Sequence, residues 1–170
     1  MPLVKAGRIV QDEFVRLAPD APVPSEAAVL LPHTRLTGEP GLAQRTAPTG
    51  VIWPNDRKVA ELAPHLPGLA LIALVFPTFK DGRAYSQARI LREQYGFEGE
   101  LRATGQVLRD QFVFMLRAGF DAFEVSKETD AAAFAETIRR YSVFYQPTVR
   151  DARLIRAEGH PAPRAAVLAR

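Results

Sequence analysis

The stretch from Phe76 to Glu124 decides the fold, because strand and helix patterns alternate along it. It reads FPTFKDGRAYSQARILREQYGFEGELRATGQVLRDQFVFMLRAGFDAFE. The apolar run Leu69–Phe76 leads into this stretch and is typical of a strand covered on both faces. Residues 83–95 then predict an amphipathic helix that ends at Gly96. Its apolar face is formed by Ala84, Ala88, Leu91 and Tyr95.

Further strand and helix patterns lie on both sides of this first pair. Upstream, residues 51–53 predict a short strand and residues 57–66 a short helix bounded by Pro67. Downstream, residues 100–104 predict a strand that Gly105 ends, and residues 121–125 predict another. Between them, residues 106–118 predict a helix whose inward side chains are Leu108, Phe112 and Met115. A last helix is expected from Thr129 or Asp130 to about Tyr145, with Phe134, Ile138, Tyr141 and Tyr145 on one face.

These patterns predict an α/β fold with about four consecutive strand–helix units and a parallel sheet. Strands that are joined through single helices run parallel, with right-handed crossovers. The sheet is either an open one or a half-barrel-like arc, and an arc would leave exposed edges that favour pairing into a homodimer.

We expect three segments along the chain. Residues 1–50 form an irregular, proline-rich N-terminal arm with a small hairpin from residues 8–10 and 14–17 and a further strand at residues 27–31. Residues 51–145 form the α/β body, and residues 146–170 form a basic C-terminal tail.

Composition narrows the class of protein. The chain has 170 residues, of which 47% are hydrophobic and 24% charged, as in a soluble globular domain. It has no cysteine, which excludes disulfides and thiolate chemistry. No apolar run reaches the roughly 20 residues of a membrane helix, and no secretory signal is recognisable. We therefore expect a cytoplasmic protein without membrane contact.

Residues 146–170 hold five arginines and two acids, which account for the whole net charge of +3. A neutral body argues against nucleic acid as a partner.

The predicted fold places a ligand site at the carboxyl ends of the strands, where helices begin. Arg83 starts one helix and Arg109 lies in the first turn of the next. A cation at a helix start is unfavourable unless an anion or an acid lies nearby. We therefore expect Arg83 and Arg109 to hold an anion, with Tyr85 and Thr104 beside it. The alternative is an ion pair with Asp81, Asp110 or Glu124.

Arg102 stands within a strand whose neighbours are apolar, and a buried guanidinium needs a partner. Glu100 and Glu124 are the candidates, which favours a structural role. Ser86 has no evident histidine base, and the three histidines lie in proline-flanked segments away from the expected site. No dinucleotide fingerprint or metal-ligand spacing is present. The sequence therefore assigns no catalytic residue, no metal site and no cofactor.

Residues 82–124 resemble a bacterial family of unknown function, chiefly through GRAYSQAR (residues 82–89) and LRATGQVLRDQ (residues 101–111). The resemblance covers about residues 50–145. Members of this family are often labelled as oxidoreductases and tend to be encoded beside assimilatory sulfite reductase genes. The resemblance implies an accessory protein of assimilatory sulfite reduction, with sulfite reductase as a partner. The alternative is a small oxidoreductase that uses a soluble cofactor.

Overall fold

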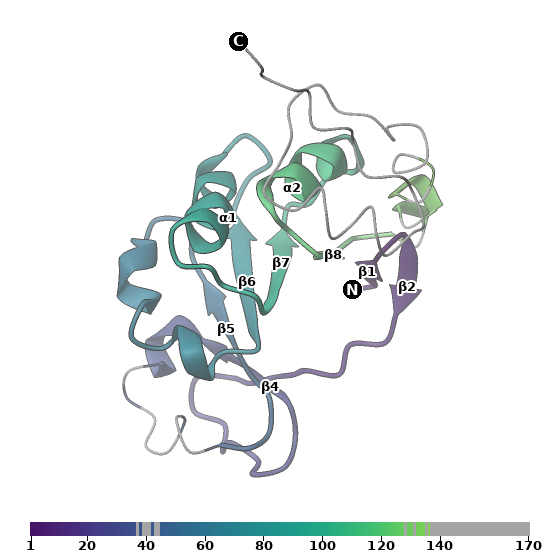
Figure 1. The fold of residues 1–170 in the computed structure, drawn as a ribbon. Helices are drawn as coiled ribbons and strands as arrows, with labels where there is room; N and C mark the ends of the chain where they lie inside the picture. The colour runs from purple at the N-terminus through teal and green to yellow at the C-terminus, as the bar shows by residue number, and fades with distance from the viewer. Residues whose placement is uncertain are drawn as a thin grey trace, which may run out of the picture.

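The computed structural model describes residues 1–36, 38, 42, 45–127, 129–130, 132–134 and 136. Within this part of the chain, one eight-stranded sheet has the strand order β2-β1-β8-β7-β6-β5-β4-β3 (Figure 1). The strands are β1 Leu3–Lys5, β2 Arg8–Val10, β3 Val15–Arg16, β4 Val29–Pro32, β5 Thr49–Trp53, β6 Leu71–Phe76, β7 Glu100–Gly105 and β8 Ala122–Glu124. The helices are α1 Arg83–Glu93 and α2 Phe112–Ala118, with short 3-10 helices η1 His33–Arg35, η3 Val59–Leu62, η4 Leu66–Gly68 and η5 Arg109–Gln111.

The fold is α/β, as predicted, but the sheet is mixed rather than parallel. The ladders from β3 to β8 are parallel, whereas β1 pairs antiparallel with both β8 and β2. The predicted count of four strand–helix units is not confirmed. The β5–β6 connection contains only the 3-10 helices η3 and η4, because Pro64 and Pro67 lack the backbone N–H that a continuous α-helix needs.

The sheet curls into a half-barrel-like arc. Its two edge strands, β2 and β3, are joined by residues 11–14 alone, which we call the crossing segment. From Val10 to Val15 an extended chain reaches at most about 18 Å. In a flat sheet of eight strands, the edge strands would lie roughly 33 Å apart. The two edges must therefore approach each other, and Figure 1 shows the chain after β2 running across to the β4 side.

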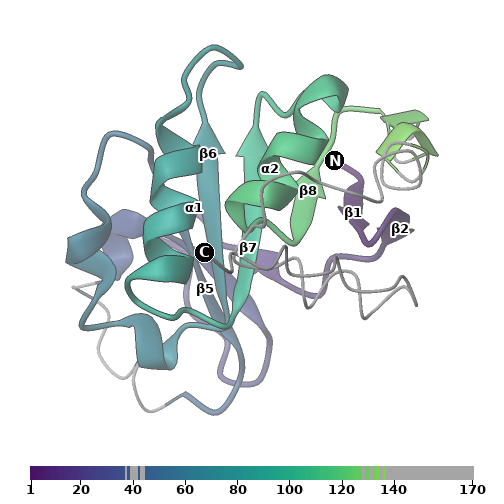
Figure 2. The same cartoon turned by 45° about the horizontal axis from the view of Figure 1, so that its top comes forward.

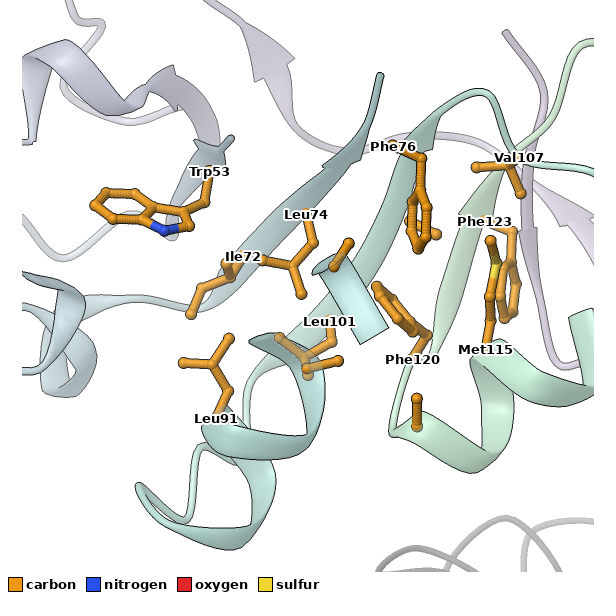
Figure 3. Packing of buried hydrophobic residues seen from close by; sticks show 14 of the residues in the cluster. Trp53, Ile72, Leu74, Phe76, Leu91, Leu101, Val107, Met115, Phe120 and Phe123 are labelled. Carbon is orange, nitrogen blue, oxygen red and sulfur yellow. The ribbon is translucent and has the colours of Figure 1, made fainter. Parts of the chain in front are cut away.

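The main core lies between the sheet and α1 and α2, which both cover one face of it (Figure 2). Side chains alternate along β7, so that Leu101 and Ala103 enter this core while Arg102 points to the opposite, concave face. The buried side chains between the two layers come from strands and helices alike (Figure 3): Ile72, Leu74, Phe76, Leu101 and Phe123 from the sheet, and Leu91 and Met115 from the helices. As predicted, Ala84, Ala88 and Leu91 lie on the buried face of α1. Tyr95, predicted on the same face, lies beyond the end of the helix at Glu93 and is 37% exposed.

The helix predicted over residues 106–118 begins later than expected. Leu108 has an extended backbone, and its side chain is 39% exposed rather than inward. The short helix η5 follows it, and α2 begins at Phe112. Phe112 and Met115 are buried as predicted. Gly119 ends the helix with a φ of 105°, a left-handed conformation that glycine adopts without strain.

The N-terminal segment, expected to be an irregular arm, supplies β1 to β4 of the sheet. The hairpin predicted from residues 8–10 and 14–17 is wrong, because β2 pairs with β1 and β3 pairs with β4. Ala6 and Gly7 both have positive φ, which gives β1 and β2 the two-residue turn favoured by a tight hairpin. The strand expected at residues 27–31 appears as β4.

Beyond β8, the backbone is helical at residues 129–130, 132–134 and 136, where a helix was predicted. Phe134 is buried, and its ring centroid lies 4.8 Å from those of Phe112 and Phe123. Ile138, Tyr141, Tyr145 and the basic tail at residues 146–170 lie outside the described residues. Among the helices that the structure describes, none has the length and apolar character needed to cross a bilayer.

Candidate functional site

Arg102 lies at the centre of a charged cluster on the concave face of the sheet. Its side chain is 0% exposed, and it donates hydrogen bonds to Asp12 at 2.6 Å and to Glu100 at 2.8 Å. Glu124 lies at 3.4 Å, and the ring of Phe14 faces the guanidinium at 5.8 Å. Burial alone would lower the pKa of Arg102, but the acids that surround it raise it. Both partners expected from the sequence are confirmed, and this arrangement supports a structural role.

Thr104 belongs to the same concave cluster. Its hydroxyl donates to one oxygen of Glu124 at 2.5 Å, and Arg16 donates to both oxygens at 2.8 Å. Glu124 is buried, and hydrogen bonds to both oxygens satisfy a carboxylate that burial would otherwise penalise. The hydroxyl that we expected beside the anion site is therefore engaged on the concave face.

Arg83 lies at the rim formed by the carboxyl ends of the parallel strands, at the start of α1. Its guanidinium donates to both oxygens of Asp81, at 3.0 and 2.7 Å, and its backbone N–H also donates to this carboxylate. The Arg83 guanidinium holds the pKa of Asp81 well below its usual range. Asp81 thus occupies the place next to Arg83 where we expected an anion, which is the alternative that the sequence left open.

Tyr85 is half-buried beneath this rim. Its ring packs edge-on against Phe76 and Phe120, with centroid distances of 5.3 and 6.4 Å. Burial, with the negative charge of Asp110, raises the pKa of Tyr85 to about 12. The phenol therefore keeps its proton at neutral pH and can act as a hydrogen-bond donor but not as a ready acid.

Two rim connections are tied together by hydrogen bonds. The backbone N–H of Phe79, in the β6–α1 connection, donates to Gln106 at 3.2 Å, and Gln111 donates to the carbonyl of Phe79 at 2.9 Å. Gln106 and Gln111 belong to the β7–α2 connection, which also carries Arg109. The fold therefore brings the neighbourhoods of Arg83 and Arg109 to one side of the molecule.

This rim exposes large apolar side chains, a feature that the sequence analysis missed. Phe114 is 61% exposed, and Phe79 and Leu108 are exposed as well. Lys80 lies over the ring of Phe79 at 5.7 Å. Neither Lys80 nor Arg109 forms an ion pair within the part of the chain that the structure describes. We call the following five residues the rim patch: Phe79, Lys80, Leu108, Arg109 and Phe114.

The signal for the rim patch was present in the sequence. A helix that buries Phe112 and Met115 turns Phe114 outward, because residues two apart lie on different sides of a helix. Gln111 and Phe114, three residues apart, share one side, and Gln111 also contacts Phe79. Among the described residues, no group of three or more histidine, aspartate or glutamate side chains is placed to hold a metal ion.

Comparison with known proteins identifies a family but no function. The model of a family described as a bacterial protein of unknown function (DUF934) matches residues 50–155, more than half of the chain. No protein with a curated description matches. The matched segment contains all of β5 except its first residue, the strands β6 to β8, both α-helices and all of the rim patch. The chain belongs to the bacterial DUF934 family of proteins of unknown function.

Proposed function

We propose that the protein is an accessory protein of assimilatory sulfite reduction that docks on sulfite reductase through the rim patch and holds an anion at the rim. The single observation behind this proposal is the rim patch itself. Phe79 and Leu108 expose apolar area on two connections that are linked by hydrogen bonds, and Phe114 exposes its ring in the first turn of α2 that follows. Exposed aromatic side chains on a supported surface are typical of protein-binding sites. The choice of partner rests on the resemblance described for residues 82–124.

The charge of the rim patch indicates the chemistry of the partner surface. Lys80 and Arg109 flank the exposed apolar side chains, and both lack an ion pair in the described residues. A complementary surface would carry acidic residues around an apolar depression, because opposite charges steer association and suppress other partners. An acidic face of sulfite reductase is therefore the proposed occupant.

The proposed anion lies between Arg83 and Arg109, and sulfite and sulfate are the candidates. Arg83 is exposed and already paired with Asp81. Solvent screens an exposed ion pair, so an external anion can compete with Asp81 for the guanidinium. Guanidinium groups bind tetrahedral and planar oxyanions through forked hydrogen bonds. Two observations support this part of the proposal. Arg109 is exposed, and hydrogen bonds link its connection, β7–α2, to the β6–α1 connection that leads into Arg83.

Binding to purified sulfite reductase tests the docking role. We expect the wild-type protein to bind, and the double variant Phe79→Ser/Phe114→Ser to lose at least about tenfold in affinity. Ile9→Ser is the control, because Ile9 is also exposed but belongs to the edge strand β2 and not to the rim. Failure of the wild type to bind would contradict the proposal, as would equal binding by the double variant. Self-association through the rim patch, seen by analytical ultracentrifugation, would instead identify a homodimer interface.

A further inference from the structure

Asp81 fills the anion position at the start of α1 from within the chain. Its carboxylate accepts hydrogen bonds from three donors of Arg83. The backbone N–H and Nε donate to Oδ1 at 3.2 and 3.0 Å, and a terminal guanidinium nitrogen donates to Oδ2 at 2.7 Å. The side chain of Arg83 is 58% exposed and that of Asp81 is 22% exposed, so solvent ions can reach the pair. An anion that arrives at Arg83 must therefore compete with Asp81 for these donors.

Asp81 competes well because its backbone is held beside Arg83. The backbone N–H of Asp81 donates to the carbonyl of Thr78 at 3.1 Å and closes the turn that precedes α1. The N–H of Arg83 that the carboxylate accepts is one of those that the first turn of a helix leaves without an internal partner. A group tethered two residues from its partner acts at an effective concentration of about millimolar or above. Asp81 therefore weakens the binding of any external anion to Arg83.

Asn55 offers the Asp81 carboxylate a second partner. The side chain of Asn55 is only 7% exposed, and its Nδ2 makes no hydrogen bond of acceptable geometry within the described residues. The pKa of Asp81 is lowered chiefly by Arg83 and further by Asn55, so the amide of Asn55 lies beside this carboxylate. A buried donor without a partner is costly. A small movement of the carboxylate toward Asn55 would satisfy this donor.

We infer that Asp81 is a gate for the anion site at the rim, an inference that rests on the anion site of the proposed function. In the absence of an anion, the carboxylate of Asp81 occupies the donors of Arg83. When an anion binds between Arg83 and Arg109, the carboxylate moves to Nδ2 of Asn55. The displaced group keeps a hydrogen bond there, so an anion can replace it without leaving it unpaired. The gate lowers the affinity of the rim, so the site fills only when the anion is abundant.

Asp56 provides the control that separates the gate from simple charge repulsion. The pKa of Arg83 is raised by Asp81, through hydrogen bonds and charge, and by Asp56, through charge alone. Asp56 is exposed, and no hydrogen bond joins it to Arg83 in the described part of the chain. Asp81→Asn and Asp56→Asn make the same change in net charge near the same guanidinium. Only Asp81→Asn removes the carboxylate that competes for the donors of Arg83, and it keeps the size of the side chain.

An NMR titration of the ¹⁵N-labelled full chain with sodium sulfate tests the gate, with sodium chloride at matched ionic strength as the reference. The backbone amide signal of Arg83 reports binding. We expect sulfate to bind Asp81→Asn at least about tenfold more tightly than the wild type, because the internal competitor is lost. Asp56→Asn should gain no more than about threefold, because solvent and salt screen an exposed charge. In the wild type, saturating sulfate should also shift the side-chain amide signals of Asn55.

The outcomes distinguish failure of the gate from failure of the anion site. Equal gains in Asp81→Asn and Asp56→Asn would show that Asp81 acts by repulsion alone, and they would overturn the gate while leaving the anion site. Unchanged signals of Asn55 in a wild-type protein that binds sulfate would overturn it as well. If sulfate binds neither the wild type nor Asp81→Asn, the anion site of the proposed function fails and the gate fails with it. Binding to Asp81→Asn without measurable binding to the wild type or to Asp56→Asn would support a gate that is closed at rest.

Discussion

Arg16 of β3 and Glu124 of β8 are in direct contact, with one guanidinium nitrogen 2.8 Å from each carboxylate oxygen. Four strands, β4 to β7, separate them in the order of the sheet. In a flat sheet, their strands would lie roughly 24 Å apart, well beyond the reach of two side chains. Their contact shows that the arc closes far enough for side chains to meet across its concave face.

Arg102 lies on this concave face and should contribute strongly to the free energy of unfolding, because three acidic side chains surround it. Arg102→Ala removes the cation that Asp12, Glu100 and Glu124 share, and leaves those acids facing one another. We expect the free energy of unfolding to fall by about 3–5 kcal/mol, as when one partner of a buried ion pair is removed. Urea denaturation measures the change.

Arg16→Ala is the comparison for Arg102→Ala. Arg16 is half exposed, and Glu124 would keep its contacts with Thr104 and Arg102. We therefore expect a clearly smaller loss. A loss equal to that of Arg102→Ala would contradict the view that Arg102 is the centre of the cluster.

The carboxyl group of Asp12 should make the free energy of unfolding depend on pH in the acidic range. Burial raises the pKa of its carboxyl, but the hydrogen bonds and charge of Arg102, with the backbone N–H of Phe14, outweigh this and lower it. Because the pKa is lower in the folded than in the unfolded state, the stabilisation is present above the unfolded value of about 3.9 and is lost as the pH falls through the folded value. Asp12→Asn should therefore be less stable than the wild type at pH 7, and the difference should shrink below about pH 4.

Urea midpoints at pH 7, 4 and 3 provide this measurement. Asp20→Asn serves as the control, because Asp20 is exposed and no hydrogen bond or ion pair holds its side chain in the described structure. A difference between the Asp12 variant and the wild type that stays constant down to pH 3 would refute the assignment.

Phe112 and Phe114 provide a matched pair on α2. Phe112 is fully buried, with its ring centroid 5.3 Å from that of Phe123, whereas Phe114 is exposed. Phe112→Ala should lower the free energy of unfolding by about 3–5 kcal/mol through the cavity that it leaves. Phe114→Ala should change it by no more than about 0.5 kcal/mol. If chemical denaturation showed similar losses for the two variants, the assignment of Phe112 to the buried side of α2 and of Phe114 to its exposed side would be wrong.

Anion binding at the rim predicts a ligand-dependent melting temperature. Sulfite, sulfate or phosphate should raise the melting temperature above that in chloride at matched ionic strength, because a ligand of the folded state stabilises it by mass action. Arg83→Ala and Arg109→Ala should each abolish the rise. Arg89→Ala should retain it, since Arg89 is also an exposed arginine of α1 with an acidic partner, Glu93. If no anion exceeds the chloride control, the rim site does not exist.

Local elements were the most predictable part of this protein. The start of α1 at Arg83, the strand β6 and the end of α2 at Gly119 follow from residue patterns within one or two turns. The pairing of Arg83 with Asp81, two residues away, was also among the predicted alternatives. Such features depend on neighbours in the sequence, so the sequence contains the information that determines them.

The outward position of Leu108 was not predictable in the same way. Its spacing from Phe112 and Met115 suits a helix, but the chain must first leave β7 at Gly105, where φ is +94° and a Cβ atom would lie 2.4 Å from the carbonyl oxygen of Phe76. This close approach sets the path of the connection and delays the helix. The burial of the Gln87 amide depends likewise on how the β5–β6 connection packs on α1, because its two hydrogen bonds go to the carbonyls of Pro54 and Arg57.

By itself, the sequence determined that Arg102 must have acidic partners, because a buried guanidinium without them is prohibitively costly, and Glu100 lies two residues away. Only the tertiary structure decided that Asp12, 90 residues away, completes the cluster, and that Arg16 reaches Glu124 across 108 residues. Both contacts require the curl of the sheet. The short crossing segment between the two edge strands requires that curl, and this long-range constraint is not contained in any local pattern of residues.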